Sequence, residues 1–424
     1  MVMRNRSFAI IITLIFIASF CIADSAYATN GTRELGFSAR DSAMAGATTA
    51  SPEDTSCLVK NPASLVWIGN RVDAMYQSIL PYATMEPNGP NVLALGNVPL
   101  ANKGVGQKST INYIPGVDIG VSYRIPGTEK YPISVGLGIF TMAGVEVNYP
   151  SSRINRAIPG IIGEYDKMMD LRSMRIAPGI AAAFNDKLSF GATANIEIQG
   201  LRSNTATASL AETAGGGNWD FAAGAGFTTG LLYKFNDMLN LGVTYESHTW
   251  INKHHKYKDS LPRIDEPQVI SAGLAFKPIK NFEFTYDTRY INWTGVKIAK
   301  DEPSNGGFGW QDQWVFAFGG EYTLKDKKDN DKLKLRLGYN YGKSQIQPSV
   351  VFANACLGLI MEHHLTTGFS YYLTKDLSLD LVWEHHFRNV MSDNGAGDIY
   401  SIRGDGTKIT TSAEVISVGL GYKF

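Results

Sequence analysis

The sequence predicts an all-β fold: a 14-stranded antiparallel transmembrane β-barrel with a small N-terminal helical hatch that plugs the lumen. Three observations predict it. Segments that alternate apolar and polar residues recur from Val72 to the C-terminus, the links between them alternate between short and long, and the chain ends on an aromatic residue. Alternation with a period of two indicates strands, and a membrane barrel needs one apolar face and one polar or small face on each of them.

The last segment, Glu414 to Phe424, carries the alternation most clearly. Its apolar face holds Ile416, Val418, Leu420, Tyr422 and Phe424. A half-buried strand of a soluble sandwich also alternates, but it seldom ends the chain on a bare aromatic residue with glycines on its second face. An aromatic C-terminal residue after such a strand resembles the recognition signal of bacterial outer-membrane barrels. This resemblance implies the barrel-assembly machinery as a partner.

The composition fits one large barrel. The chain has 424 residues, a length that allows two or three soluble domains or a single barrel. Lysine and arginine number 39 and aspartate and glutamate also 39, so no excess of charge favours a nucleic acid as partner. After the N-terminus, no apolar run approaches the roughly 20 residues that a transmembrane helix needs.

Residues 1–28 are predicted to be a signal peptide. Two arginines precede an apolar core from Phe8 to Ile22, and Ala26-Tyr27-Ala28 is a small-x-small cleavage motif. Cys21 raises a lipoprotein alternative, which is disfavoured because Phe20 stands where a small residue is needed.

Two further cysteines, Cys57 and Cys356, follow the signal peptide. In an oxidising periplasm they could pair, but they lie far apart in the sequence and nothing in it fixes their geometry. Two separate thiols are the favoured interpretation.

Residues 29–70 are predicted to form the hatch, and residues 71–424 the barrel. The hatch segment lacks sustained alternation and has two short helix signals, one near Arg40 to Gly46 and one at Asn61-Pro62-Ala63. Asn61 can cap exposed helix amides, and Pro62 suits the first helical position.

Fourteen alternating segments are predicted to be strands, an even number as single-chain bacterial barrels require. They span residues 72–86, 117–126, 131–147, 171–184, 187–203, 219–235, 238–252, 267–277, 280–294, 312–324, 332–343, 363–374, 377–388 and 412–424. Short links such as Asn185-Asp186 alternate with long ones such as Pro87 to Gly116. Outer-membrane barrels have short periplasmic turns and long outer loops, which places both termini in the periplasm.

The chain resembles the FadL family of outer-membrane transporters for hydrophobic compounds. The residues that carry the resemblance are Gly36 to Ala47, Asn61-Pro62-Ala63, Glu362 to Phe369 and the turn Thr374-Lys375-Asp376. The resemblance covers essentially the whole mature chain. It implies a bacterial outer-membrane location, a 14-stranded barrel closed by an N-terminal hatch, and a hydrophobic ligand held inside and released sideways where a strand is kinked.

Candidate ligand-binding residues come from two groups. Arg289, Lys334 and Arg336 are cations that strand parity places in the lumen, where one could hold a ligand carboxylate. The alternative is that they pair with the other charges that parity places in the lumen: Arg175, Glu197, Glu246, Glu283, Asp287 and Glu321. The apolar residues Ile158, Ile161 and Met168 could form an outer capture surface or pack between loops.

Catalytic, metal and cofactor sites are not expected. The sequence has no Gly-x-Ser-x-Gly, Cys-x-x-Cys or His-Glu-x-x-His motif. The adjacent pairs His363-His364 and His385-His386 lie in predicted strands, where neighbouring side chains face opposite sides.

The predicted function is passive uptake of hydrophobic compounds such as long-chain fatty acids. The ligand is captured outside and released laterally, or inward past the hatch. The alternatives are a general diffusion porin, which needs an open lumen, and, less favoured, an outer-membrane lipid hydrolase. A monomer in contact with outer-membrane lipids is expected.

Overall fold

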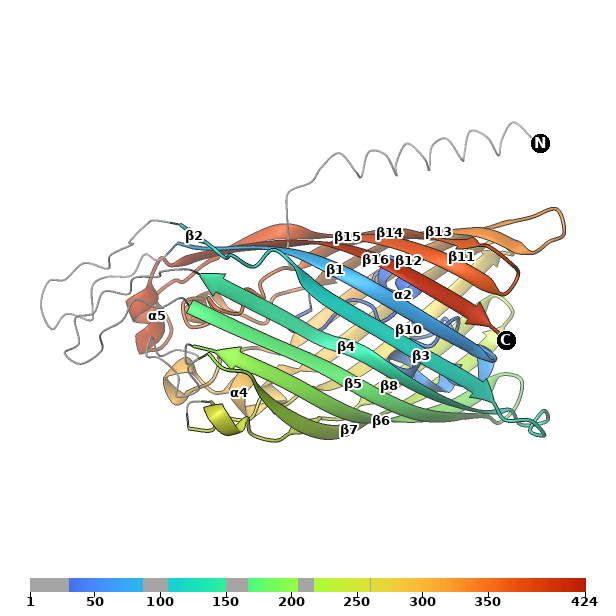
Figure 1. The fold of residues 1–424 in the computed structure, drawn as a ribbon, viewed down its shortest axis with the longest axis horizontal. Helices are drawn as coiled ribbons and strands as arrows, with labels where there is room; N and C mark the ends of the chain where they lie inside the picture. The colour runs from blue at the N-terminus through green and yellow to red at the C-terminus, as the bar shows by residue number, and fades with distance from the viewer. Residues whose placement is uncertain (1–29, 87–105, 150–166, 205–216, 260) are drawn as a thin grey trace, which may run out of the picture.

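The computed structural model describes residues 30–86, 106–149, 167–204, 217–259 and 261–424. The predicted signal peptide lies outside these residues. One antiparallel sheet closes on itself, because the last strand pairs with the first along its whole length (Figure 1). The predicted barrel is therefore confirmed.

In the described part of the chain, fourteen long strands form the wall. They are β1 (Arg71–Glu86), β3 (Ile114–Arg124), β4 (Ile133–Tyr149), β5 (Lys167–Ala183), β6 (Leu188–Ser203), β7 (Asp220–Asn236), β8 (Leu239–Glu246), β10 (Gln268–Ile279), β11 (Phe282–Asn292), β12 (Gln313–Lys325), β13 (Asp331–Gly342), β14 (His363–Tyr372), β15 (Leu377–Ser392) and β16 (Lys408–Lys423). Two short strands, β2 (Gln107–Lys108) and β9 (Trp250–Ile251), pair at the edges of β1 and β7. Each predicted segment overlaps one long strand, although the predicted segment 238–252 is interrupted after Glu246.

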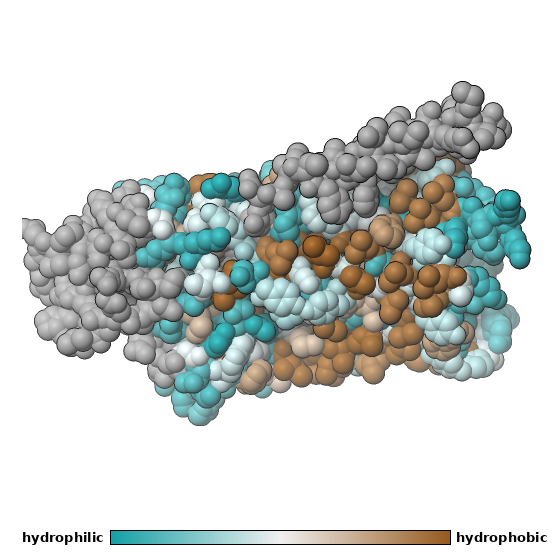
Figure 2. All heavy atoms as spheres, turned by 45° about the horizontal axis from the view of Figure 1, so that its top comes forward, coloured by the Kyte–Doolittle hydropathy of each residue, from teal (hydrophilic) through white to brown (hydrophobic). Residues whose placement is uncertain are grey.

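The two faces of the wall differ as the alternation predicts. On β3 the side chains of Val117, Ile119, Val121 and Tyr123 are exposed, while Asp118 and Ser122 between them are buried. Apolar side chains form a broad band along the barrel wall in Figure 2, and hydrophilic ones lie toward both ends of it. The apolar outer face is the surface that lipid covers in a membrane barrel. Among the described residues, no helix is long and apolar enough to cross a membrane.

The two ends of the barrel are also different. The C-terminus and the short turns lie at one end, and the long loops lie at the other (Figure 1). These loops carry η2 (His255–Tyr257), η3 (Trp293–Gly295), α4 (Lys297–Lys300), η4 (Pro303–Asn305), η5 (Pro348–Val350) and α5 (Ile399–Gly404). Short turns mark the periplasmic end of outer-membrane barrels, so the loop end faces outward.

Residues 30–70 lie inside the barrel, toward its periplasmic half (Figure 1). They contain α2 (Ala39–Ala43), α3 (Cys57–Lys60) and η1 (Pro62–Trp67). Asn61 caps η1, because its Oδ1 accepts a hydrogen bond from the Ala63 amide at 3.2 Å, and Pro62 occupies the first turn. The helix that the Asn-Pro-Ala run predicts is therefore present as a 3₁₀ helix. Cys57 and Cys356 are not joined by a disulfide.

Glycines of the wall make room for this segment. A Cβ atom added at Gly191 would collide with the backbone of Pro62, one at Gly230 with the Asn61 side chain, and one at Gly242 with the backbone of Thr49. The Asn61 side chain also donates hydrogen bonds to the carbonyl oxygens of Thr49 at 2.7 Å and Leu231 at 3.1 Å. We call residues 30–70 the hatch.

Closure of the barrel can be tested with a disulfide across its seam. Ala74 of β1 is the register partner of Leu420 of β16. In a background lacking Cys57 and Cys356, we expect Ala74→Cys with Leu420→Cys to form a disulfide during folding, because paired positions in a sheet lie within bonding range. Gel mobility of the boiled protein with and without reductant reports the bond. Ala74→Cys with Val418→Cys is the matched control, and equal cross-linking of both pairs would count against the closed register.

Candidate functional site

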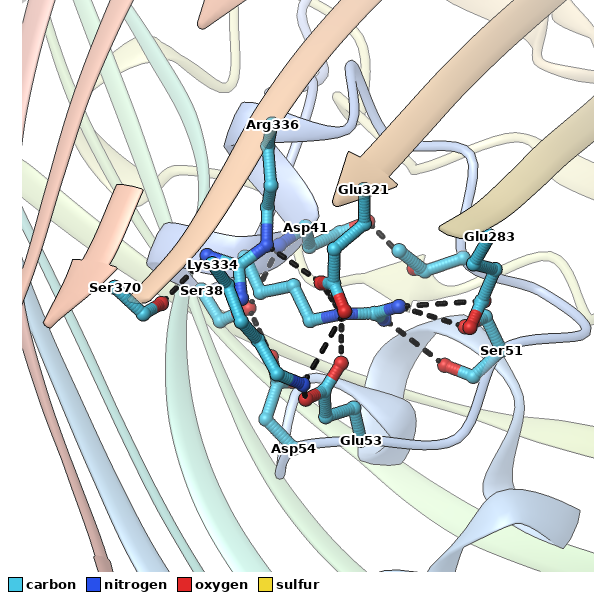
Figure 3. Close-up of polar contacts among 12 residues, drawn as sticks. Ser38, Asp41, Ser51, Glu53, Asp54, Glu283, Glu321, Lys334, Arg336 and Ser370 are labelled. Atoms are coloured by element: carbon cyan, nitrogen blue, oxygen red, sulfur yellow. Dashed lines mark hydrogen bonds and ion pairs between the residues drawn. The ribbon is translucent and has the colours of Figure 1, made fainter. Parts of the chain in front are cut away.

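A buried ionic network fixes the hatch to the wall, and Glu283, Glu321, Lys334 and Arg336 of the wall point toward hatch residues Ser51 and Glu53 (Figure 3). Its centre is Arg40 of α2, whose Nε donates to Oε2 of Glu321 on β12 at 3.1 Å. The same guanidinium lies 3.4 Å from Glu283 on β11 and donates to the Ser51 hydroxyl at 2.7 Å. Arg40, Glu283 and Glu321 are all buried. Ionised partners make the stronger hydrogen bonds, so this network holds the hatch firmly.

Two of the predicted ligand-binding cations belong to this network. Arg336 of β13 donates from Nε to Glu321 at 2.7 Å and from Nη1 to the Ser370 hydroxyl at 2.6 Å. Lys334 pairs with Glu53 of the hatch and lies 3.2 Å from Glu321. A cavity of about 310 Å³ adjoins Lys334 and the short turns of the periplasmic end. Both cations therefore have carboxylate partners, and they lie on the periplasmic side of the hatch.

A second ionic network joins the start of the hatch to the opposite wall. Arg33 donates to both carboxylate oxygens of Glu246 on β8, at 3.1 and 2.8 Å. Glu246 also lies 2.9 Å from Arg175 of β5, which donates to Glu197 of β6 at 2.9 Å. The lumen charges that parity identifies thus mostly pair with one another and with the hatch.

Arg289 of β11 is placed differently. Its Nη2 donates to the carbonyl oxygen of Gly46 at 2.8 Å, and no carboxylate of the described residues lies within 4.0 Å of its guanidinium. Lys60 of the hatch lies close by and is 3.5 Å from Asp41. Burial and the charge of Arg289 lower the pKa of Lys60 to about 8, although Asp41 and Asp287 oppose this shift. A cavity of about 30 Å³ lies between Arg33, Lys60 and Arg289.

The outer half of the lumen is filled by apolar side chains, which we call the outer apolar cluster. They come from the inner faces of the strands and from the loops that follow β9, β11 and β13. Members include Val145, Met169, Leu171, Leu261, Ile264, Ile291, Trp293, Phe308, Trp310, Val351, Leu357 and Ile360. The Trp310 ring lies 5.0 Å from that of Trp293, edge to face, and 4.9 Å from that of Phe308, stacked. A cavity of about 20 Å³ lies among them.

Strand β11 shows where the polar hatch gives way to this cluster. Two successive inward side chains of β11 contact the hatch. Asp287 accepts a hydrogen bond from the Thr49 amide at 3.0 Å, and Arg289 donates one to the Gly46 carbonyl oxygen. The next inward residue, Ile291, and then Trp293 belong to the outer apolar cluster. Arg289 therefore lies at the boundary between the polar and the apolar halves of the lumen.

The predicted capture residues are placed as follows. Ile158 and Ile161 lie outside the described residues. Met168 is on β5, on the face opposite to Met169 and Leu171, which belong to the outer apolar cluster. Met169 was not among the predicted capture residues. The signal was present in the sequence, because Arg175, which parity places inward, lies six residues further along the same strand and therefore on the same face.

The wall has a gap in its backbone pairing between β3 and β4. The ladder between these strands ends at the pair Ile119 and Ile139. Beyond it β3 continues along β1 to Ile114, and β4 continues along β5 past a register shift at Thr141 to Ala143. Thr141 spans the gap with its hydroxyl, which donates to the Val117 carbonyl at 3.0 Å.

The hatch lies against the inner side of this gap. Arg33 forms an isolated bridge with Ala143, and the Glu34 amide donates to the Met142 carbonyl oxygen at 3.3 Å. The register shift lies in β4, the third long strand of the wall. The hatch and the wall gap are thus in direct contact.

The histidine pairs are split by the strands. His364 and His386 are fully buried and face each other across β14 and β15, with ring centroids 4.6 Å apart. His363 instead lies tilted against Tyr341, and His385 stacks on Trp383, on the other face of the wall. Within the described ranges, no group of three or more His, Cys, Asp or Glu side chains could hold a metal ion.

The hatch network predicts the effect of removing its shared carboxylate. Glu321→Gln leaves Arg40, Lys334 and Arg336 without their common partner, and breaking a buried pair destabilises by about 3–5 kcal/mol. We expect faster hydrogen exchange in the hatch amides while the barrel strands stay protected. Glu86→Gln, which breaks the exposed pair with Lys408, is the control and should change stability by less than about 1 kcal/mol. Unchanged hatch exchange in Glu321→Gln would show that the network does not hold the hatch.

The comparisons with known proteins agree with this geometry. The family model described as "Outer membrane protein transport protein (OMPP1/FadL/TodX)" matches residues 16–424. The chain is similar in structure to the toluene transporter TodX of P. putida, with a TM-score of 0.65 and 18% identity over 92% of this chain and 99% of that chain. It is also similar to a Pseudomonas aeruginosa FadL homologue, with a TM-score of 0.65 and 14% identity over 93% and 100% of the two chains.

A third similar structure is the CymD monoaromatic hydrocarbon channel, with a TM-score of 0.59 and 14% identity over 92% of this chain and 98% of that chain. No curated protein sequence matches the chain. At these identities the solved structures support the fold, and the family model supports the class of function. The chain belongs to the OMPP1/FadL/TodX family of outer membrane transport proteins, non-enzymatic outer-membrane channels for hydrophobic compounds.

Proposed function

We propose that this channel takes up long-chain fatty acids passively, with the alkyl chain in the outer apolar cluster and the carboxylate at Arg289. The observation that carries the proposal is the position of Arg289. It lies where the apolar half of the lumen meets the hatch, and among the described residues it has no carboxylate partner within 4.0 Å. An amphipathic ligand meets both environments there.

The energetics separate the roles of the two parts. Burying an alkyl chain contributes about 0.8 kcal/mol per CH₂, so the apolar cluster supplies most of the affinity. A charge-assisted hydrogen bond contributes on the order of 1.5–3 kcal/mol, so Arg289 orients the ligand and selects acids. Lys334 and Arg336 are less suited to binding the ligand carboxylate, because Glu53 and Glu321 already pair with them.

Room for the ligand comes from the loops. The cavity within the outer apolar cluster holds about 20 Å³, no more than one water molecule needs. A long alkyl chain therefore replaces contacts made by loop side chains such as Phe308, Val351 and Leu357. An outer capture surface that includes Ile158 and Ile161 remains part of the proposal.

A monoaromatic hydrocarbon is the second candidate ligand. The Trp310 ring contacts the rings of both Trp293 and Phe308, and such a site suits a small aromatic molecule. Two of the similar structures are named for toluene or monoaromatic hydrocarbons. A general diffusion porin is less favoured, because the hatch occupies the lumen and is ion-paired to the wall.

The proposed exit is sideways, through the gap between β3 and β4. There the ladder lacks backbone pairing, and the wall is completed by the Thr141 side chain and by hatch residues Arg33 and Glu34. An apolar ligand that leaves by this route enters the lipid directly and is not transferred through the polar hatch.

The ligand assignment predicts different effects on acids and hydrocarbons. We expect Arg289→Ala to weaken binding of palmitate by roughly tenfold to a hundredfold and to leave binding of hexadecane unchanged, because only the acid uses the cation. Arg289→Lys keeps the charge and should recover part of the affinity. Isothermal titration in detergent measures both ligands, with the exposed Arg388→Ala as control. If palmitate binding is the same in parent and Arg289→Ala, the hydrocarbon alternative is favoured.

The exit route predicts that a covalent staple across the gap blocks transport. We expect Val117→Cys with Thr141→Cys to form a disulfide, because the Thr141 hydroxyl already hydrogen-bonds to the backbone amide and carbonyl of Val117. Uptake of a labelled fatty acid by cells should fall under oxidising conditions and recover with reductant. Val121→Cys with Leu137→Cys lies on the paired part of the same two strands and is the control. Undiminished uptake by the oxidised Val117/Thr141 variant would exclude this exit.

A further inference from the structure

A compact charged cluster lies on the outer face of the wall, at the loop end of β4, β5 and β6. It consists of Glu146, Asp170, Arg172 and Arg202. Arg172 lies 2.9 Å from Glu146 and 3.0 Å from Asp170, and Arg202 lies 3.2 Å from Glu146 and 3.1 Å from Asp170. Each arginine thus contacts both carboxylates. We call Arg172 and Arg202 the rim arginines.

The cluster lies at the outer boundary of the apolar belt. Below it on the same strands, Met174 and Ile180 of β5 and Ile196 and Ile198 of β6 are exposed on the lipid-facing side. Phe221 of β7 is 67% exposed and stacks on Trp219 with ring centroids 6.1 Å apart. Aromatic girdles mark the membrane interfaces of outer-membrane barrels, so the rim arginines lie at the level of the outer-leaflet headgroups.

The arrangement leaves both guanidinium groups exposed and oriented. The side chains of Arg172 and Arg202 are 42% and 30% exposed, whereas those of Glu146 and Asp170 are 8% and 0% exposed. Both guanidinium groups also lie over the Trp219 ring, at 5.3 and 5.0 Å from its centroid. The carboxylates and the ring restrict the side chains, so binding a ligand costs little additional conformational entropy.

Hydrogen-bond donors remain on both rim arginines. The printed contacts to Glu146 and Asp170 use Nε and Nη2 of Arg172 and Nη2 of Arg202. Within the described residues, no hydrogen bond uses Nη1 of either arginine. Nε of Arg202 also has no partner but is buried. Planar guanidinium groups match the oxygens of a phosphate in a bidentate way.

We propose that the rim arginines bind a phosphate of a lipopolysaccharide headgroup in the outer leaflet. The assignment rests on three observations together: exposed guanidinium groups with donors to spare, their position directly above the lipid-facing apolar surface, and the aromatic pair beside them. The acyl chains of the same lipid lie over Met174, Ile196 and Ile198, while its phosphate contacts Arg172 and Arg202. A headgroup held there lies beside β4, the strand that borders the wall gap.

The test uses the full-length protein in detergent and purified lipid A with its phosphates. Native mass spectrometry measures the apparent dissociation constant for one bound lipid. We expect Arg172→Gln with Arg202→Gln to weaken this binding at least tenfold. Lipid A stripped of its phosphates should bind parent and variant equally weakly. Arg388→Gln, an exposed arginine of β15 toward the same end, is the matched control and should bind like the parent.

A second variant guards against a folding defect, because the double substitution leaves two carboxylates unpaired. Glu146→Gln and Asp170→Asn added to the double variant give a neutral cluster that keeps hydrogen-bonding groups, and it should lose lipid A binding to the same extent. The gel shift between unboiled and boiled protein confirms a folded barrel. Parent-level lipid A binding in either variant overturns the proposal, as does an equal loss in Arg388→Gln. Displacement of lipid A by equimolar inorganic phosphate would assign the site to free anions and overturn the lipid assignment.

Discussion

The closure of the sheet at the seam between β1 and β16 is the constraint on which the structure depends. In the hydrocarbon of a membrane, an unpaired backbone amide or carbonyl costs several kcal/mol, and only a closed sheet has no unpaired edge. All 16 residues of β1 have a partner on β16. Between β3 and β4, where backbone pairing is relaxed, the Thr141 hydroxyl and Asp118 compensate, because the Asp118 carboxylate accepts a hydrogen bond from the Thr141 amide at 2.7 Å.

Closure creates a lumen, and the contents of that lumen divide it into two chemical halves. Ion pairs such as that of Arg40 with Glu321 hold the hatch in the periplasmic half. Apolar loop side chains fill the outer half. A solute that enters from outside therefore meets apolar side chains first, and these favour hydrophobic solutes over polar ones. Selection by this channel comes from the interior packing and does not need a narrow aqueous pore.

Strand order and facing could be predicted from the sequence because both follow from a period of two. Arg175 and Glu197, assigned to the lumen by parity, are fully buried and pair with each other. The partners of Arg289 and Lys334 could not be predicted, because Gly46 and Glu53 belong to the hatch, whose path has no periodicity and is fixed by tertiary contacts. The period of two also distinguishes Met169 from its neighbour on β5. Met169 faces the lumen, whereas Met168, the predicted capture residue, lies on the opposite face.

The contact between the hatch and the closing strands has a consequence for the order of assembly. A Cβ atom on Gly419 of β16 would lie 2.8 Å from that of Ala39, and Asp73 of β1 accepts from the Thr55 amide of the hatch at 2.9 Å. The hatch is synthesised before every strand, whereas β16 is synthesised last. The hatch must therefore be inside before β16 pairs with β1. A barrel that closed earlier would leave the N-terminal segment outside the lumen.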